Sequence, residues 1–145
     1  MGIFDRLFGT KRNAEPDEAT AYPISFSGKG PYQKSFGNDF GVVFEDDGET
    51  GYFYATNGSH TTIFDALHVY DRNTPDAIPV GEQLFVVWNP SRKRAGLYFR
   101  GQFQAVFDFA RRRGGCRNGF PPPGKQWSET GHNWDEELTD GLQPT

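Results

Sequence analysis

Cysteine, methionine and long hydrophobic runs are scarce in this sequence of 145 residues, and each shortage excludes a class of protein. Cys116 is the one cysteine, which excludes an internal disulfide framework and a zinc site built from several cysteines. No apolar stretch approaches the roughly 18 residues that a membrane-spanning helix needs. Hydrophobic residues make up 35% of the chain, below the usual range for globular proteins, so the core must use few but large side chains.

Aromatic residues supply those large side chains. They make up 16% of the sequence, with 14 Phe, 6 Tyr and 3 Trp, and each ring buries roughly 150–250 Å², which excludes disorder throughout. Gly (18) and Pro (10) together favour strands and turns over long helices. The connections between apolar runs are too short for the helical crossovers of a parallel sheet. The prediction is a mainly β fold, α+β at most. We expect an antiparallel β-meander sheet or a partly closed roll, with a short N-terminal helix and an irregular C-terminal tail.

Two hairpin signals organise the middle of the chain. Asp47-Gly48 lies in an acidic loop between the β-rich runs Phe40–Phe44 and Thr50–Ala55, and Arg100-Gly101 separates two later runs. Gly48 and Gly101 are therefore predicted in tight turns, where glycine tolerates a positive φ. The later runs expected to form strands are Leu84–Trp88, Gly96–Phe99 and Phe103–Phe109.

The segment Thr61–Asp71 fits two patterns. Ile63, Leu67 and Tyr70 fit one helical face, whereas Leu67, Val69 and Asp71, alternating with His68 and Tyr70, also fit an extended strand. We favour a short turn followed by a strand over Ala66–Tyr70. Alternation along the strands is expected to expose some of the predicted core, which consists of Phe44, Phe53, Leu84, Val86, Trp88, Leu97, Phe99, Val106 and Phe107.

The two ends of the chain are expected to differ from its middle. Met1–Thr10 is a short amphipathic segment, predicted to dock as a helical turn on its own domain or, alternatively, on a membrane or partner. The predicted organisation is a segment and linker over 1–20, one β-rich domain over 21–127 and an acidic tail over 128–145, whose end with Asp135–Glu137 and Asp140 is expected to be mobile. An unpaired thiol without an export signal favours the cytoplasm.

Charge is unevenly distributed along the sequence. Between Ser91 and Arg117 there are eight Arg or Lys residues and one acid, a net charge of +7, so the remainder carries −11 of the total −4. The run Arg111, Arg112, Arg113 is a single arginine-glycine element on an acidic protein, so a solvated face or pairing with the acidic tail is favoured over nucleic-acid binding. A protein partner for this run is the other alternative.

No catalytic motif stands out. His60, His68 and His132 show no metal-ligand spacing, and the acidic loop lacks the pattern of a calcium-binding loop, so no metal or cofactor is predicted. Cys116 lies close to several arginines that would lower its pKa in a surface loop, but no local pattern pairs it with a base. A pocket near His68 and Asp65 is kept as the alternative site, for a small enzyme or a ligand-binding domain.

Several stretches of the chain are also typical of a known family. They are Phe44–Ala55 (FEDDGETGYFYA), Asp65–Tyr70 (DALHVY), Ala105–Phe109 (AVFDF) and Cys116–Pro123 (CRNGFPPP). Over about Gly41 to Trp127 the sequence resembles the uncharacterised bacterial family called domain of unknown function 2251. The resemblance implies no catalytic residues. Small acidic bacterial proteins of this kind are often immunity proteins encoded beside secreted toxins, which is an association and not a property of these residues.

These observations favour a surface over a catalytic centre. The hypothesis is a non-enzymatic protein-binding domain, most concretely an immunity protein that binds and neutralises a cognate secreted toxin. Its expected contacts are four acids that would project together from the first hairpin turn, with an alternative basic surface at Arg111, Arg112 and Arg113. The four acids are Glu45, Asp46, Asp47 and Glu49.

Overall fold

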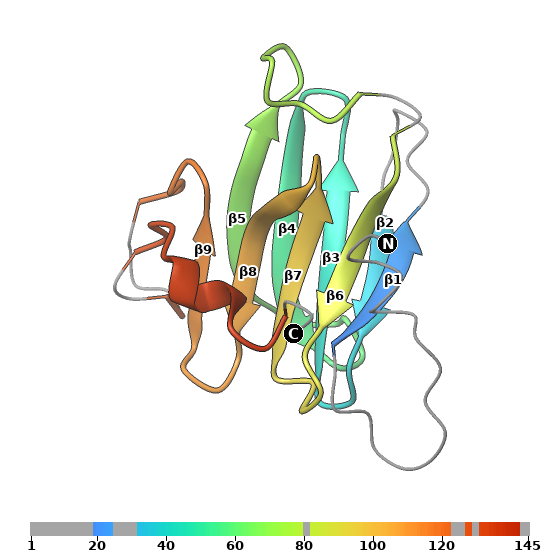
Figure 1. Ribbon diagram of the computed structural model, residues 1–145, viewed down its shortest axis with the longest axis vertical. Coiled ribbons are helices and arrows are strands. Elements are labelled where there is room, and N and C mark those ends of the chain that lie inside the picture. The colour runs from blue at the N-terminus through green and yellow to red at the C-terminus, as the bar shows by residue number, and fades with distance from the viewer. Residues whose placement is uncertain (1–18, 25–31, 80–81, 123–126, 129–130, 143–145) are drawn as a thin grey trace.

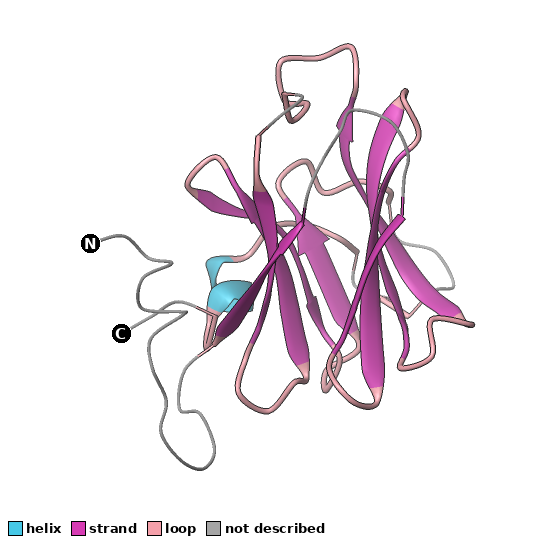
Figure 2. Ribbon diagram, turned by 90° about the vertical axis from the view of Figure 1, so that its right-hand side faces the viewer, coloured by secondary structure: helices cyan, strands magenta, loops and turns pink. Residues whose placement is uncertain are grey.

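The computed structural model describes residues 19–24, 32–79, 82–122, 127–128 and 131–142. Within these residues the chain forms two layers of strands, nine in all, and one short 3₁₀ helix (Figure 1, Figure 2). The elements are β1 (Thr20–Ile24), β2 (Tyr32–Phe36), β3 (Phe40–Asp46), β4 (Thr50–Asn57), β5 (Ile63–Asp71), β6 (Leu84–Trp88), β7 (Arg94–Phe99), β8 (Gln102–Asp108), β9 (Arg113–Cys116) and η1 (Glu136–Thr139).

The strands divide into two antiparallel sheets. Sheet A has the order β1-β6-β7-β8-β9, and sheet B has the order β2-β3-β4-β5. The prediction of a mainly β, antiparallel fold is therefore confirmed. Most neighbours in a sheet are also neighbours in sequence, but the chain crosses from sheet A to sheet B after β1 and returns after β5. These two crossings produce two stacked sheets, whereas the sequence had indicated a single curled sheet or roll.

The hairpin turns form where the local sequence predicts them. Gly48 and Gly101 have φ values of 95° and 76°, so both occupy left-handed turn positions that glycine adopts without steric cost. The segment that fitted two patterns is extended throughout as β5, which begins three residues earlier than the predicted Ala66–Tyr70. The helical alternative for this segment is wrong, because pairing with β4 uses its backbone in a sheet ladder.

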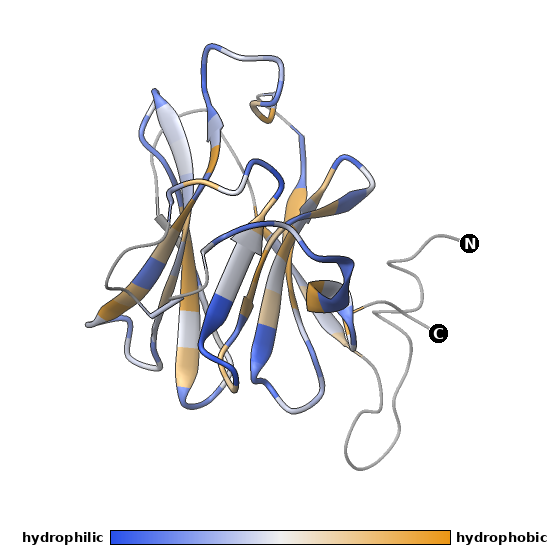
Figure 3. Ribbon diagram, turned by 90° about the vertical axis from the view of Figure 1, so that its left-hand side faces the viewer, coloured by the Kyte–Doolittle hydropathy of each residue, from blue (hydrophilic) through white to orange (hydrophobic). Residues whose placement is uncertain are grey.

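The main core lies between the two sheets, whose strands contain the hydrophobic stretches coloured orange in Figure 3, and it is rich in rings. Phe53 and Phe107 stack across it with ring centroids 5.3 Å apart, and Tyr70 packs edge-on against Phe99 at 6.3 Å. Trp127 closes one side, 5.5 Å from the ring of Phe109. All nine predicted core residues are 0–1% exposed, which confirms the core prediction.

The expectation that alternation would expose some of those residues is wrong, because sheet A is buried on both faces. Val106 points away from the main core into a second cluster with Val87 and Phe103, and Leu138 and Leu142 cover this cluster from outside. Figure 2 shows η1, in cyan, on the outer side of this layer. Residues 131–142 are thus packed on the domain, and the prediction of a mobile end does not hold for them.

Other segments differ from the sequence prediction. β1 was not predicted and begins inside the expected linker, and β9 forms from the glycine-rich run after β8. A side chain at position 114 would lie 2.7 Å from the ring of Phe107, so only glycine lets β9 lie this close to β8. The short N-terminal helix predicted over 1–10 lies outside the described residues and is not confirmed.

Candidate functional site

The four acids of the first hairpin turn do not project together. Asp46, the last residue of β3, is only 1% exposed and points into the end of the sandwich. Glu45 points to the opposite, outer face, where its Oε1 accepts a 2.7 Å hydrogen bond from the hydroxyl of Tyr54. This arrangement corrects the prediction, and its cause is the strand alternation, which sends adjacent side chains to opposite faces of a sheet.

Asp46 is the centre of a buried network. Its Oδ2 accepts hydrogen bonds from the Tyr70 hydroxyl, at 2.6 Å, and from the Arg72 guanidinium, while its Oδ1 accepts from the backbone N–H of Gly48 at 2.8 Å. Burial, followed by the hydrogen bond to Asp46, raises the pKa of Tyr70 far above its ordinary value, so the phenol stays protonated as a donor. A buried carboxylate is stable only when its acceptor sites are satisfied in this way.

The network fixes two turns against each other. Arg72 donates its backbone N–H to the carbonyl of Glu49 at 2.6 Å and its Nη1 to the carbonyl of Ile78 at 2.6 Å. Its guanidinium also lies over the ring of Tyr70, 5.2 Å from the centroid. The β3–β4 turn and the turn that follows β5 are therefore held by side-chain contacts from beneath as well as by their own backbones.

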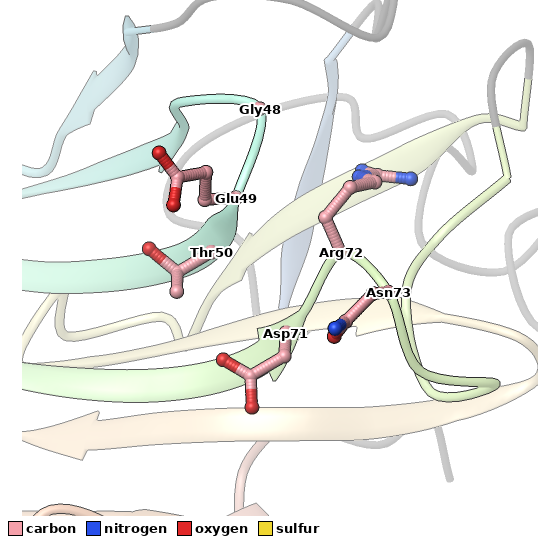
Figure 4. Close-up of a pocket in the computed structure, with 6 residues that line it drawn as sticks. All are labelled: Gly48, Glu49, Thr50, Asp71, Arg72 and Asn73. Carbon is pink, nitrogen blue, oxygen red and sulfur yellow. The ribbon is translucent and has the colours of Figure 1, made fainter.

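Between these two turns lies a hollow of about 530 Å³. We call it the hairpin-end surface, and it is lined by Gly48, Glu49, Thr50, Asp71, Arg72 and Asn73. Figure 4 shows the side chains of Glu49 and Asp71 on the same side of the view, with Arg72 turned the other way. Asp71 also accepts a 2.9 Å contact from Nε2 of His68. The hollow therefore presents carboxylates to a bound ligand, while the guanidinium of Arg72 is hydrogen-bonded to Asp46.

Asp47 has a structural task in the same turn. Its Oδ1 accepts the backbone N–H groups of Glu49 and Thr50, each at 2.8 Å. These hydrogen bonds, of which the one from Thr50 has the largest effect, hold the pKa of Asp47 below its ordinary value. Asp47 therefore stays ionised in the turn.

The alternative site near His68 and Asp65 is not formed by these two residues. Asp65 pairs with Ala55 of the core face, whereas His68 pairs with Tyr52 of the outer face, where their rings stack at 5.0 Å. Asp65 is 4% exposed and contacts Ser128 and His132 instead. The two residues therefore lie on opposite faces of β5 and cannot share a pocket.

Asp65, Ser128 and His132 form what we call the carboxylate clamp. The Ser128 hydroxyl donates to Asp65 Oδ2 at 2.5 Å and accepts the backbone N–H of Gly114 at 2.7 Å. His132 Nε2 lies 3.0 Å from the same carboxylate oxygen, and its Nδ1 lies 2.7 Å from the carbonyl of Pro121. Serine and histidine both contact the aspartate and not each other, so this is no nucleophile–base pair.

The clamp keeps a charged histidine inside the protein. A carbonyl and a carboxylate only accept hydrogen bonds, so both ring nitrogens of His132 carry protons. Burial by itself would lower the pKa of His132, but the hydrogen bonds to Asp65 and Pro121 and the charge of Asp65 raise it above the ordinary value. His132 and Asp65 therefore form a buried ion pair with a structural use.

Cys116 is also buried, so the surface loop in which nearby arginines would lower its pKa is not formed. Its thiol lies 3.3 Å from the carbonyl of Phe120 and 3.2 Å from Oδ1 of Asn118. Burial raises the pKa of the thiol, which disfavours the thiolate needed for nucleophilic attack.

The predicted basic surface is divided between solvent and the C-terminal segment. Arg111 and Arg112 are exposed at the β8–β9 turn, whereas Arg113 lies 3.2 Å from the carboxylate of Asp135. Pairing with the acidic tail, one of the predicted uses of this run, is thus found for Arg113. Arg94 adds to the same contact, because its Nη1 donates to the carbonyl of Asp140 at 2.8 Å.

Sequence reasoning missed Tyr70, Asp71 and Arg72 as members of the site. The signal that could have found them is register. A strand that pairs with β4 must end beside the β3–β4 turn, and Tyr70 and Asp71 end that strand while Arg72 follows it directly. In the described part of the chain, no three His, Cys, Asp or Glu side chains are placed to hold a metal ion. The same residues contain no helix long and apolar enough to cross a membrane.

Comparison with known proteins gives a family without an assigned role. Residues 29–143 match the family described as an uncharacterized protein conserved in bacteria (DUF2251). An uncharacterized protein of Haemophilus influenzae is 43% identical over 86 residues, which cover 58% of this chain and 53% of that protein. The matched part of the chain thus spans about half the length of this relative. No solved structure matches the chain significantly. Because the family match covers most of the sequence, the chain belongs to this uncharacterised bacterial family.

Proposed function

We propose that the protein is a non-enzymatic protein-binding domain that receives a cationic segment of its partner at the hairpin-end surface. The observation that carries this proposal is the hollow of about 530 Å³ with the carboxylates of Glu49 and Asp71 on one side. Carboxylates suit a lysine ammonium or an arginine guanidinium, which form charge-assisted hydrogen bonds with them.

Rigidity supports this proposal. The buried contacts of Asp46 with Tyr70, Arg72 and Gly48 hold both turns before any partner arrives. A surface that is already ordered loses less conformational entropy on binding, so more of the contact energy is kept as affinity.

Charge supports it as well. The chain carries a net charge of −4. Within the basic stretch from Ser91 to Arg117, Arg94 forms an ion pair with Asp108 and Arg113 forms one with Asp135. An acidic surface attracts a basic partner over distance and raises the association rate.

The most concrete form of this proposal is an immunity protein that binds and neutralises a cognate secreted toxin in the cytoplasm. The acidic net charge supports it, as does the frequent occurrence of small acidic bacterial proteins as immunity proteins. A toxin gene immediately beside the gene for this chain favours the immunity role, whereas a metabolic operon opposes it. A pull-down from native lysate, with and without the neighbouring gene product, identifies the partner to be purified.

The contact surface is tested by charge reversal of exposed acids. Affinity of the purified partner is measured across a salt series for the wild type and for the double variant E49K/D71K. The control is D39K/E137K, which changes the net charge equally at two exposed acids outside the hairpin-end surface. Asp46 is left intact, because it is buried and its reversal would disrupt the fold.

We expect E49K/D71K to weaken binding about tenfold or more, mainly through the association rate, and to flatten the salt dependence. D39K/E137K should retain most of the affinity. Equal affinity and equal salt slope for the wild type and E49K/D71K would refute the hairpin-end surface and direct attention to Arg111 and Arg112.

A further inference from the structure

A second hollow lies at the edge of the sandwich where the first strands of the two sheets meet. We call it the edge hollow; it measures about 500 Å³ and is lined by Tyr22, Pro23, Ile24, Lys34, Ser35, Gly37, Asn38 and Arg92. The first three belong to β1, the next two to β2, and Arg92 lies in the β6–β7 turn. Figure 1 shows that turn at the end of the molecule opposite to the β3–β4 turn, so the edge hollow is separate from the hairpin-end surface.

Arg92 is the chemically distinctive residue of the edge hollow. Its Nη1 is buried and has no hydrogen-bond partner among the described residues. Its guanidinium lies over the ring of Tyr22, 5.5 Å from the centroid, so one face of the cation is already removed from water. A buried donor on a charged group is costly without an acceptor, and an anion in the hollow would supply one.

Lys34 brings a second cation to the same hollow. Its side chain is exposed on β2 and also lines a neighbouring hollow of about 320 Å³ on the outer face of sheet B. That neighbouring hollow includes Val43, Tyr54 and Ile63, and Ile63 is 61% exposed. Lys34 therefore stands between two concave surfaces that both offer apolar contact area.

The walls of the edge hollow are partly apolar as well. Tyr22 is 39% exposed, and Pro23 and Ile24 stand beside it in β1. A guanidinium binds a planar carboxylate through two parallel hydrogen bonds, and the ammonium of a lysine that lines the same hollow adds a point charge. The apolar wall would contact the rest of such a ligand.

From these observations we propose that the edge hollow binds a carboxylate carried on an apolar body, with Arg92 and Lys34 holding the carboxylate. This goes beyond the proposed function, since the ligand has the opposite charge and binds at the other end of the sandwich. The carboxylate can belong to a free small molecule or to an acidic side chain of a peptide segment, and the experiment separates these two sources.

The test is a titration followed by amide NMR shifts of the full chain. The probes are sodium benzoate, inorganic phosphate at equal ionic strength, and a blocked five-residue peptide with one glutamate between two leucines. The variants are R92Q, which removes the charge and shortens the side chain but keeps a polar amide, and K34M, which keeps the apolar stem at an exposed position. The control is R111Q, because Arg111 is an exposed arginine outside the edge hollow.

We expect benzoate to shift the amides of Tyr22, Ile24 and Ser35 saturably, with a dissociation constant on the order of 1 mM for so small a ligand. R92Q should weaken this binding about tenfold or more, K34M should weaken it less, and R111Q should leave it unchanged. Tighter binding of the peptide than of benzoate assigns the site to a peptide segment, whereas the reverse order assigns it to small molecules.

Three results would overturn the proposal. One is the absence of saturable shifts at the edge hollow with either carboxylate probe. Another is a benzoate affinity that is the same for the wild type, for K34M and for R92Q, when far-ultraviolet circular dichroism shows that both variants are folded. Stronger binding of inorganic phosphate than of benzoate would contradict the assignment to a carboxylate on an apolar body. If R92Q does not fold, equal affinity for K34M and the wild type by itself overturns the proposal, because the proposal has Lys34 and Arg92 hold the carboxylate together.

Discussion

Two buried carboxylates, Asp46 and Asp65, are used in different ways. Asp46 accepts hydrogen bonds from residues at one end of the sandwich, and the turns that it fixes enclose an open hollow. Asp65 contacts Ser128 and His132, which lie 63 and 67 residues later in sequence and are themselves buried. Burial of an acid therefore does not by itself identify a binding site; the exposed groups that it positions do.

The largest expected effect is the loss of the Asp65 carboxylate. D65A removes the acceptor of Ser128 and leaves the charge of His132 buried without its partner, so the free energy of unfolding should fall by about 3–5 kcal/mol. Urea denaturation followed by circular dichroism measures this. D65N, which keeps one acceptor, should cost less than D65A. A loss below about 1 kcal/mol for D65A would show that the clamp carries little of the stability.

A smaller loss is expected at the other carboxylate. D46A leaves the buried Tyr70 hydroxyl without its acceptor, but Arg72 keeps its contact with the Ile78 carbonyl, so the cost should be roughly 1–3 kcal/mol. The same variant should weaken partner binding, because the two turns lose their common anchor. Denaturation and affinity are measured on the same preparation, and D65A serves as the comparison. Equal affinity of D46A and the wild type would mean that the turns do not need this anchor.

The smallest of the three expected effects is a pH dependence of stability, which the carboxylate clamp should show and the network around Asp46 should not. His132 has its pKa raised in the folded state, so its contribution to stability is fully present below about pH 6.5 and is lost as the pH rises through the folded-state pKa. Stability of the wild type should therefore decline more steeply between pH 6 and pH 9 than that of H132Q. Thermal unfolding across this range measures both slopes. Parallel curves would show that His132 is not charged in the clamp.

The parts of the fold that depend on near neighbours in sequence could be predicted. Asp47-Gly48 and Arg100-Gly101 lie in turns because positive φ is a local property of these residues. Most of the predicted core residues lie on the strand face that meets the other sheet, as alternation along a ring-rich strand predicts, but the burial of Val106 on the opposite face of sheet A does not follow from alternation. The sandwich itself could not be predicted in this way, because the crossings after β1 and β5 depend on which strands pair at long range.

Only the acids of the β3–β4 turn were predicted for the candidate site, because its other residues depend on long-range strand pairing as well. Four acids within five residues resemble a solvated turn, and that describes Asp47 and Glu49 well. The partner that buries Asp46 is Arg72, 26 residues away, and the contact exists only because β3, β4 and β5 end in register. Similarly, the face of sheet A that holds Val106 looks exposed until residues 138 and 142 are placed on it.

The carboxylate clamp also has a consequence for how the chain is made. During synthesis Asp65 leaves the ribosome 67 residues before His132 does. Until then the nascent chain holds β5 with an acid on its core face and no counter-charge, and sheet A lacks the leucines that cover its outer side. Completion of the native structure must therefore wait for the last part of the described chain, and stalled or shortened chains should present apolar surface to chaperones and proteases.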